Sequence, residues 1–446
     1  MTECTTEQMI FSFYDQKPLT ATFNGGDISS DGGLVFLRQL ESRFPLIDQL
    51  VCALTDSRDR RYITHEARTM LRQRVFQIAC NYSDCNDATT MRHDAILKLC
   101  CNADLATGDA LASQPTLSRL ENSVTNRDLY RIGEALVAAY LSTYTRRPKK
   151  IILDVDTTDD PTYGGQQLSF FNGFYGTYMY HPMIVSDGQK GTLIAAVLRP
   201  GNAGNSNGAL AVLKRIIQKI RERWRGIRII IRADAGFAIP ELYDYCENED
   251  ILYIVGFQAT ERLKTLNKTN LDMARNRYTA SKKKVRRLTS TQYRANSWRK
   301  QRRVLMKSEV TAQGDNQRFV VTNMRGRSLD LYDFYGGRGQ MENQVIKEFK
   351  LDLNAGRLSC HRFAANQFRL FLHASAYQLL HALRCLLHGT ELASARIDRI
   401  RSTVLKIGVR VRNSVRRVWV DFASGYPLKG VLRTLFTRLN VVPSSA

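Results

Sequence analysis

The sequence predicts an α/β fold with a mixed-sheet core, a β-rich insertion within that core, and a mainly helical domain before it. Two observations lead to this class. Apolar residues recur at helical spacing through residues 1–145, whereas strand-like and helix-like segments alternate after the basic hinge at 146–150. With 43% hydrophobic and 24% charged residues, the composition is that of a folded chain, which excludes a disordered or collagen-like one.

The first 145 residues read as helices separated by Gly and Asp/Ser clusters. Helical periodicity is clear in the segments 33–50, 67–80 and 128–144. Residues 113–122 predict a short helix with exposed polar positions, which is typical of the recognition helix of a helix-turn-helix and equally of an ordinary helix start. We expect residues 1–145 to form a mainly helical DNA-binding domain.

The next part of the chain alternates strands and helices. Apolar runs predict strands at 150–156, 175–185, 192–198, 226–234 and 251–257, with helices from Gly208 onward and at 241–248. The order strand-strand-strand-helix-strand-helix-strand suits a ribonuclease-H-like core. We therefore predict a core formed by residues 146–257 and 331–390, interrupted by the insertion 258–330 and followed by a basic C-terminal region, 391–446.

The formal net charge of +23 is unevenly distributed. Residues 1–250 carry 28 basic and 30 acidic residues, whereas residues 251–446 carry 37 basic and 12 acidic ones. Such an excess makes a polyanion the expected partner, and without an amphipathic basic anchor it favours nucleic acid over a membrane. Aromatic residues interleaved with cations in the insertion suit contact with bases and phosphates, the candidates being Lys282, Lys283, Lys284, Arg286, Arg287 and Trp298.

Two apolar strands end in aspartate, which is costly to bury unless the carboxylate is paired or bound to metal. Asp154 and Asp156 share one strand face, and Asp234 ends another strand, so spacing alone does not choose between the first two. Strand-end aspartates also cap turns, which is the structural alternative. A third carboxylate, Glu342, follows in a helix-like segment opened by glycines, on one face with Tyr335 and Arg338.

Together these segments resemble the DDE transposases of bacterial insertion sequences. The resemblance rests on residues 153–158, on residues 231–237, and on the Tyr335, Arg338 and Glu342 helix, and is closest to the group with a Tyr-x2-Arg-x3-Glu-x6-Lys signature and a β-rich insertion. The segments 113–122 and 405–408 are also similar to that group. The order of the motifs is specific, with 78 positions from Asp156 to Asp234 and 108 from Asp234 to Glu342.

This resemblance implies a set of functional residues. It implies Asp156, Asp234 and Glu342 as catalytic ligands of two Mg²⁺ ions, for which Mn²⁺ can substitute, in phosphodiester cleavage and strand transfer. Tyr335 and Arg338 would hold phosphate, as would a lysine. The signature lysine falls on Phe349 in this chain, so Lys350, one position later, is the candidate and Lys347 its rival. Trp298 would stack on an unpaired base, or simply pack in the insertion.

The implied partners are double-stranded DNA, at the element's ends and in the target, and a second copy of the chain in the DNA complex. We expect a cytoplasmic protein, because the sequence lacks a signal peptide pattern and a membrane-spanning apolar run. The resemblance implies that it is bacterial and associated with the nucleoid. Two alternatives stay open: an inactive or regulatory DNA-binding relative, and a phosphatase in which Asp154 and Asp156 would belong to a DxDxT loop.

Overall fold

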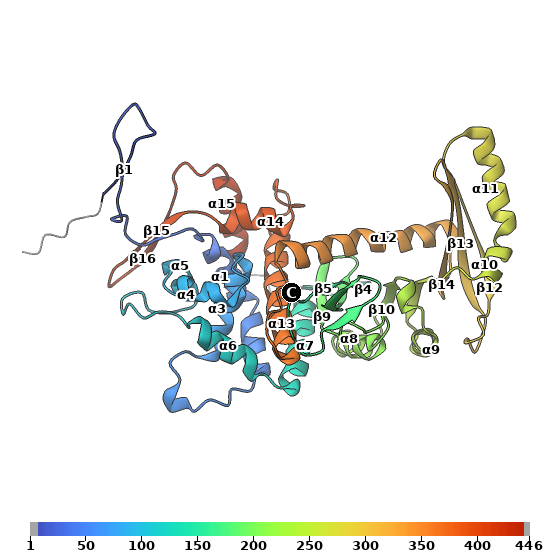
Figure 1. Ribbon diagram of the computed structural model, residues 1–446, viewed down its shortest axis with the longest axis horizontal. Coiled ribbons are helices and arrows are strands. Elements are labelled where there is room, and N and C mark those ends of the chain that lie inside the picture. The colour runs from blue at the N-terminus through green and yellow to red at the C-terminus, as the bar shows by residue number, and fades with distance from the viewer. Residues whose placement is uncertain (1–7, 441–446) are drawn as a thin grey trace, which may run out of the picture. The chain divides into compact units, whose positions relative to one another are not determined.

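The structure, a computed structural model, describes residues 8–440 apart from the side chains of residues 340–342. The chain divides into two compact units (Figure 1). Unit 1 comprises residues 1–51, 56–120 and 379–446, and unit 2 comprises residues 52–55 and 121–378.

Helices are the predominant regular elements of residues 8–120, as the apolar periodicity predicts. The helices are α1 (Leu34–Arg43), α2 (Leu46–Ala53), α3 (Ala67–Ala79), α4 (Ala88–Met91), α5 (Ala95–Cys100) and α6 (Gln114–Ser123). The helix α6 confirms the element predicted at 113–122. However, α5 and α6 are separated by residues 101–113, a segment much longer than the turn of a helix-turn-helix. The interpretation of α6 as the recognition helix of a helix-turn-helix is therefore wrong.

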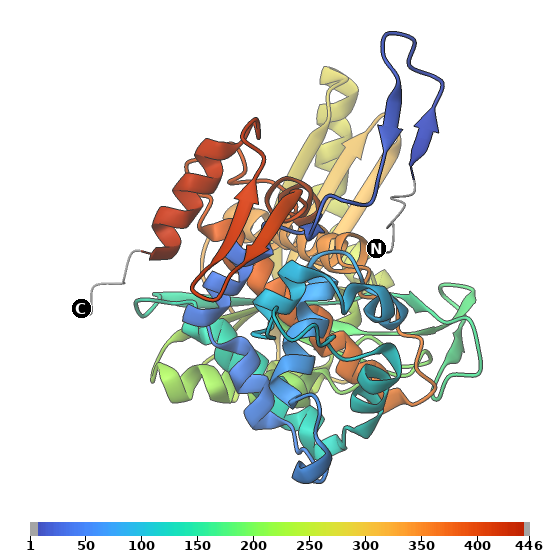
Figure 2. The same cartoon turned by 90° about the vertical axis from the view of Figure 1, so that its left-hand side faces the viewer.

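Unit 1 contains an N-terminal and a C-terminal segment of the chain, which a three-stranded sheet of order β16-β15-β3 joins (Figure 2). The C-terminal elements of unit 1 are α14 (Ile397–Ile400), the π-helical turn η5 (Arg401–Leu405), β15 (Val409–Asn413), β16 (Val418–Phe422) and α15 (Lys429–Asn440). The N-terminal strands of unit 1 are β1 (Met9–Phe11), β2 (Leu19–Ala21) and β3 (Ile28–Ser29). At this junction the Lys406 ammonium lies 2.7 Å from the buried Asp31 carboxylate. A Cβ on Gly33 would lie 1.6 Å from the Val404 carbonyl oxygen, so glycine permits the close approach of the two segments.

Unit 2 is built around an eight-stranded sheet of order β12-β13-β14-β11-β10-β4-β8-β9. The pairs β4–β10 and β10–β11 are parallel and the others antiparallel, which confirms the predicted mixed-sheet α/β class. Its first strands are β4 (Lys150–Thr157), β8 (Met183–Asp187), β9 (Thr192–Val197), β10 (Arg228–Ala233) and β11 (Leu252–Phe257). A separate small sheet contains β5 (Asp160–Pro161), β7 (Thr177–Tyr180) and β6 (Phe170–Asn172).

The insertion continues the main sheet. Its strands β12 (Val285–Tyr293), β13 (Arg302–Thr311) and β14 (Gly314–Thr322) join the core where β14 pairs with β11. It also contains two helices, α10 (Glu261–Leu266) and α11 (Lys268–Ser281), which the sequence analysis did not anticipate. The β-rich prediction therefore holds for the second half of the segment, and its first half is helical.

Helices cover both faces of the central strands (Figure 1). The odd-numbered residues of β4, such as Leu153, pack in one core with α7 (Asn126–Ser142), α8 (Ala209–Arg223) and α9 (Pro240–Asn248). On the opposite face, α12 (Ser328–Lys347) crosses β4, β8 and β10, and leads through a π-helical turn, η4 (Glu348–Asp352), to α13 (Phe363–Cys385). Because side chains alternate along a strand, Asp154, Asp156 and Arg232 lie on the face that α12 covers.

Candidate active site

Asp154 is held in a buried ion pair. Its carboxylate accepts two hydrogen bonds of 2.6 Å from the Arg232 guanidinium, and the two side chains are 0% and 4% exposed. Burial raises the pKa of Asp154, and the hydrogen bonds and charge of Arg232 oppose that rise. A Cβ on Gly188 would lie 2.6 Å from the carboxylate, so the chain closes over the pair. Asp154 is therefore a structural residue without room for a substrate.

Asp156 and Asp234 occupy neighbouring positions at the carboxyl ends of parallel strands. The last registered pair of β4 and β10 is Val155 with Ala233, and each aspartate is the next residue. Adjacent strands lie about 4.8 Å apart, so these two residues are within reach of one shared ion. Both are partly exposed. Asp156 accepts a hydrogen bond of 2.8 Å from the Thr157 amide, and Asp234 one of 2.9 Å from the Gly236 amide.

The helix α12 supplies the residues that face these aspartates. Arg232 donates a 2.8 Å hydrogen bond to the Phe334 carbonyl, which ties the helix to β10. The Tyr335 hydroxyl lies 2.7 Å from where a Cβ on Gly256 would stand, and that position is 3.1 Å from the Asp234 backbone. The Arg338 guanidinium lies 5.6 Å from the centre of the Tyr335 ring. Its charge also reaches Asp154, where it lowers the pKa.

The helix α12 begins earlier than its glycines indicate. It starts at Ser328, so the glycines that were expected to open it lie inside it. A Cβ on Gly337 would stand 3.0 Å from the Arg232 guanidinium, so glycine there lets the helix approach the buried pair. Glu342 belongs to α12 by its backbone, and its side chain lies outside the described residues.

The π-helical turn η4 contains Lys350, which stands one position later than the lysine of the family signature. A π-helical turn contains one more residue than an α-helical turn, so it moves each following side chain by one position relative to the helix before it. Phe349 is buried against Tyr377, whereas the Lys350 ammonium lies 2.6 Å from the Asp159 carboxylate, three residues after Asp156. Lys347, the rival candidate, is exposed at the end of α12.

Two further residues near the aspartates were missed from sequence. Burial raises the pKa of Tyr175, and the charges of Asp159, Asp156 and Asp234 add to the rise. Asp160 is 3% exposed, its carboxyl oxygens have no hydrogen-bond partner, and burial raises its pKa to about 8. No signal in the sequence marks Asp160 as buried, because Asp-Pro usually indicates an exposed turn.

The cations of the insertion differ in their surroundings. Lys282 and Lys283 are exposed at the end of α11. Lys284 lies 3.0 Å from Glu309, Arg286 lies 2.8 Å from Asp333, and Arg287 donates to Asn270. Part of the positive charge predicted to face DNA is thus paired within the protein.

Trp298 is a core residue. Its side chain is 2% exposed and packs against three aromatic rings of the sheet and helices, those of Tyr243, Phe257 and Tyr293. Since only 2% of the side chain is exposed, a base has no access to the indole, and the prediction that it stacks on a base is wrong. The structural alternative, simple packing, is the one observed.

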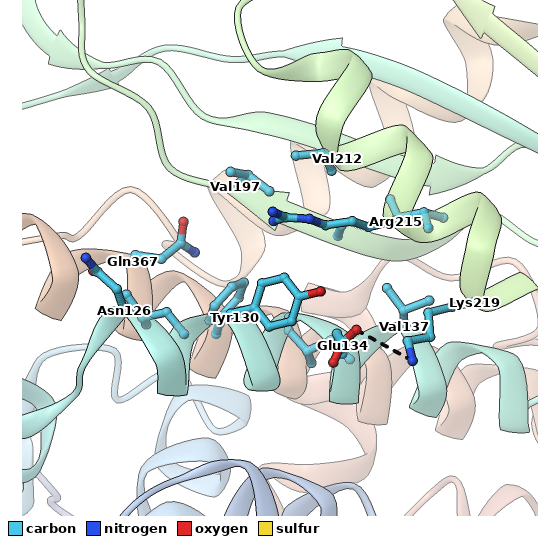
Figure 3. Close-up of a pocket in the computed structure, with 15 residues that line it drawn as sticks. Asn126, Tyr130, Glu134, Val137, Val197, Val212, Arg215, Lys219 and Gln367 are labelled. Atoms are coloured by element: carbon cyan, nitrogen blue, oxygen red, sulfur yellow. Dashed lines mark ion pairs between the residues drawn. The ribbon is translucent and has the colours of Figure 1, made fainter. Parts of the chain in front are cut away.

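A cavity of about 290 Å³ lies away from these residues, between α7 and α8 (Figure 3). Apolar side chains such as Val137 and Val212 line it, the Arg215 guanidinium stacks over Tyr130, and an ion pair of Glu134 with Lys219 stands at its edge (Figure 3). None of the predicted site residues contributes to this cavity.

The donor set suits a divalent cation in part. Asp156 and Asp234 provide hard oxygen ligands on adjacent strands, which is the chemistry that Mg²⁺ prefers. Among the side chains that the structure describes, no group of three His, Cys, Asp or Glu gathers in a metal-binding arrangement. The third expected ligand, Glu342, is not among those side chains.

The protein is of the α/β class with a mixed sheet, and its two strand-end carboxylates lie at the carboxyl ends of neighbouring parallel strands, where open α/β sheets bind their ligands. Comparison with protein families gives the particular member: the family described as transposase DDE domain group 1 matches residues 11–444. The chain therefore belongs to this DDE transposase family. Members of this class generally use divalent metal ions.

Comparison with curated proteins found no match. Among solved structures, a piggyBac transposase in a synaptic complex with hairpin DNA is similar at 10% sequence identity, with a TM-score of 0.37, over 91% of this chain and 89% of that one. Within residues 8–440, no helix is long and apolar enough to cross a membrane.

Proposed function

We propose that this protein is the transposase of a bacterial insertion sequence. It binds the terminal inverted repeats of its element as double-stranded DNA, cuts at the ends, and joins the resulting 3′-hydroxyls to target DNA. The observation that carries this proposal is the register of β4 and β10, which brings Asp156 and Asp234 side by side on the face of α12.

In this proposal Asp156, Asp234 and Glu342 hold two Mg²⁺ ions. Bound there, the ions would lower the pKa of an attacking hydroxyl and stabilise the leaving oxygen of an in-line displacement. Glu342 fits the role because it follows Tyr335 and Arg338 at i+7 and i+4, on the same face of α12. The Arg232 bridge keeps that face against the strand ends by holding the Phe334 carbonyl.

The cations near this site would bind the DNA backbone. Arg338 can grip a phosphate with its planar fork, and the Tyr335 hydroxyl can donate to one. Lys350 would exchange its ion pair with Asp159 for a phosphate when DNA enters. Farther away, the exposed Lys282 and Lys283 would add salt-sensitive, sequence-independent affinity. Because two ends must be joined, we propose a homodimer in the DNA complex.

The burial and pairing of Asp154 argue against the phosphatase alternative. A nucleophile must reach its substrate, and this carboxylate is 0% exposed and doubly hydrogen-bonded to Arg232. A regulatory DNA-binding protein is left as the competing function, and activity distinguishes it from the proposal.

The test is a gel-shift and Mg²⁺-dependent cleavage assay on the DNA that flanks the gene. The wild type should bind and cut the flanking repeats, and Asp234→Asn should bind with unchanged affinity and not cut. A wild type that binds without cutting supports the regulatory function. A wild type that neither binds nor cuts, or an Asp234→Asn variant that still cuts, contradicts the proposal.

A further inference from the structure

An unusual number of aromatic rings are exposed in one short segment next to the aspartates. We call residues 163–178 the aromatic hairpin, since β6 and β7 form its arms. Exposed fractions reach 96% for Tyr163 and 90% for Phe174, and five more apolar or aromatic side chains of the segment are between 39% and 61% exposed: Leu168, Phe170, Phe171, Tyr175 and Tyr178. A group of exposed apolar and aromatic side chains in one element often marks a binding site.

The hairpin is well anchored, so its exposure is a property of an ordered element. Phe171 faces Tyr178 across the two strands, with ring centroids 5.6 Å apart in an edge-to-face arrangement. The Asn172 side chain donates to the Gly201 carbonyl at 2.8 Å and accepts from the Phe174 amide at 3.1 Å. A Cβ on Gly201 would lie 2.1 Å from the Met179 carbonyl oxygen, so the base of the hairpin is tightly packed.

The hairpin carries no charge. Residues 161–186 contain no Lys, Arg, Asp or Glu in a chain whose net charge is +23. A surface without cations does not attract phosphates, and one rich in Phe and Tyr rings offers flat faces for stacking. Its chemistry is therefore complementary to that of the basic insertion, and it suits the bases of a nucleic acid better than the backbone.

The position of the hairpin ties it to the candidate active site. Strand β4 carries Asp156 and leads directly into β5, while β7 leads into β8, where Ile184 pairs with Asp156. Tyr175 lies in the hairpin turn between β6 and β7. Its ring also lies 5.9 Å from that of the buried His181. A DNA strand held at the aspartates would therefore have its terminal bases next to these rings.

We propose that the aromatic hairpin binds unpaired bases at the DNA strand end by stacking them on Phe174, Tyr175 and the rings beside them. The inference rests on the proposed function for its biological setting, but the binding itself does not require cleavage. Holding bases out of the duplex would hold the terminal phosphodiester at the aspartates. This is the role that Trp298, buried elsewhere in unit 2, does not fill.

The test compares two fluorescent probes of the same length, a single-stranded oligo(dT) and an oligo(dA)·oligo(dT) duplex, by anisotropy with the full chain in EDTA. Replacing the two named rings together, Phe174→Ala with Tyr175→Ala, should weaken single-strand binding by about 5- to 150-fold for each stacked base lost. Duplex binding should change less than twofold. Tyr62→Ala, which removes a ring that is 80% exposed in unit 1, is the matched control and should change neither.

Equal losses on both probes, or none, would overturn the inference. Light scattering of the same samples addresses a second copy of the chain as the occupant: a loss of dimer with unchanged single-strand binding would also overturn it. Failure of the proposed function is seen separately. Suppose that flanking DNA is never cut, but that single-strand binding depends on the rings and is retained in Asp234→Asn. That result would support base binding by the aromatic hairpin and contradict the proposed transposase function.

Discussion

Removing Arg232 should destabilise the protein far more than removing an exposed arginine with equally short ion pairs. The Arg232→Met variant leaves the Asp154 carboxylate 0% exposed, without its two 2.6 Å hydrogen bonds, and frees the Phe334 carbonyl. Breaking one side of a buried ion pair costs about 3–5 kcal/mol. Against a typical net stability of about 5–15 kcal/mol, that is a large fraction of the total.

Urea unfolding followed by circular dichroism measures this loss. The matched control is Arg275→Met, whose guanidinium lies 2.6 Å from Asp315 and is 51% exposed, so its removal should cost about 0–1 kcal/mol. The double variant Arg232→Met with Asp154→Leu should be more stable than Arg232→Met alone, because the unpaired carboxylate is gone. Equal, small losses for Arg232→Met and Arg275→Met would refute the reasoning.

The same variant has a predicted pH dependence. Without Arg232, the main opposition to the effect of burial on the pKa of Asp154 is lost and only the charge of Arg338 still opposes the rise, so the folded state favours the protonated carboxyl more than in the wild type. A group with a raised folded pKa contributes stability at low pH that is lost as the pH rises. The deficit of Arg232→Met relative to the wild type should therefore shrink as the pH falls from about 7 towards 5, and a deficit that grows would contradict this assignment.

Three further predictions concern the insertion and the buried acid. Replacing Lys282 and Lys283 with Gln should reduce the slope of log affinity for DNA against log salt concentration by up to about 1.8. Lys284→Gln should change this slope less, because Lys284 is already paired with Glu309. Equal changes in the slope would contradict this prediction. Trp298→Ala should cost about 3–5 kcal/mol in urea unfolding, and an unaltered midpoint would show that the ring is not a core residue. Because burial raises the pKa of Asp160 to about 8, its charge destabilises the fold increasingly from pH 4 to 8. Asp160→Asn should remove that pH dependence, gaining up to about 5 kcal/mol at the upper end, and a gain that does not vary with pH would refute it.

Sequence patterns predicted the central sheet well, because a buried strand leaves an apolar run that propensity alone can find. The runs ending at Asp156 and before Asp234 became neighbouring parallel strands, β4 and β10. The pattern could not decide between Asp154 and Asp156, because both lie on one strand face. That choice depends on Arg232, 78 positions away from Asp154, and a cross-strand partner leaves no local mark in the sequence.

Other features depend on tertiary contacts in the same way. The glycines of α12 indicated a helix start, but Gly337 is inside the helix because a side chain there would crowd Arg232. Trp298 is next to basic residues in the sequence, but in the structure it packs against the rings of Phe257 and Tyr293. Residues 175–185 were predicted as one strand, because aromatic and β-branched residues favour strands, but the structure divides them into β7 and β8 in different sheets. The exposure of the rings depends on tertiary packing, which the sequence pattern does not contain.

The most direct test of the account is a change of metal preference at Asp156. A thiolate is a softer ligand than a carboxylate, so Asp156→Cys should lose cleavage of the flanking DNA in Mg²⁺ and regain it in Mn²⁺ or Cd²⁺. The matched variant Asp154→Cys, which removes the partner of Arg232, should lose stability and show no such rescue. Full activity of Asp156→Cys in Mg²⁺, or rescue at Asp154 and not at Asp156, would contradict the claim that Asp156 holds the metal.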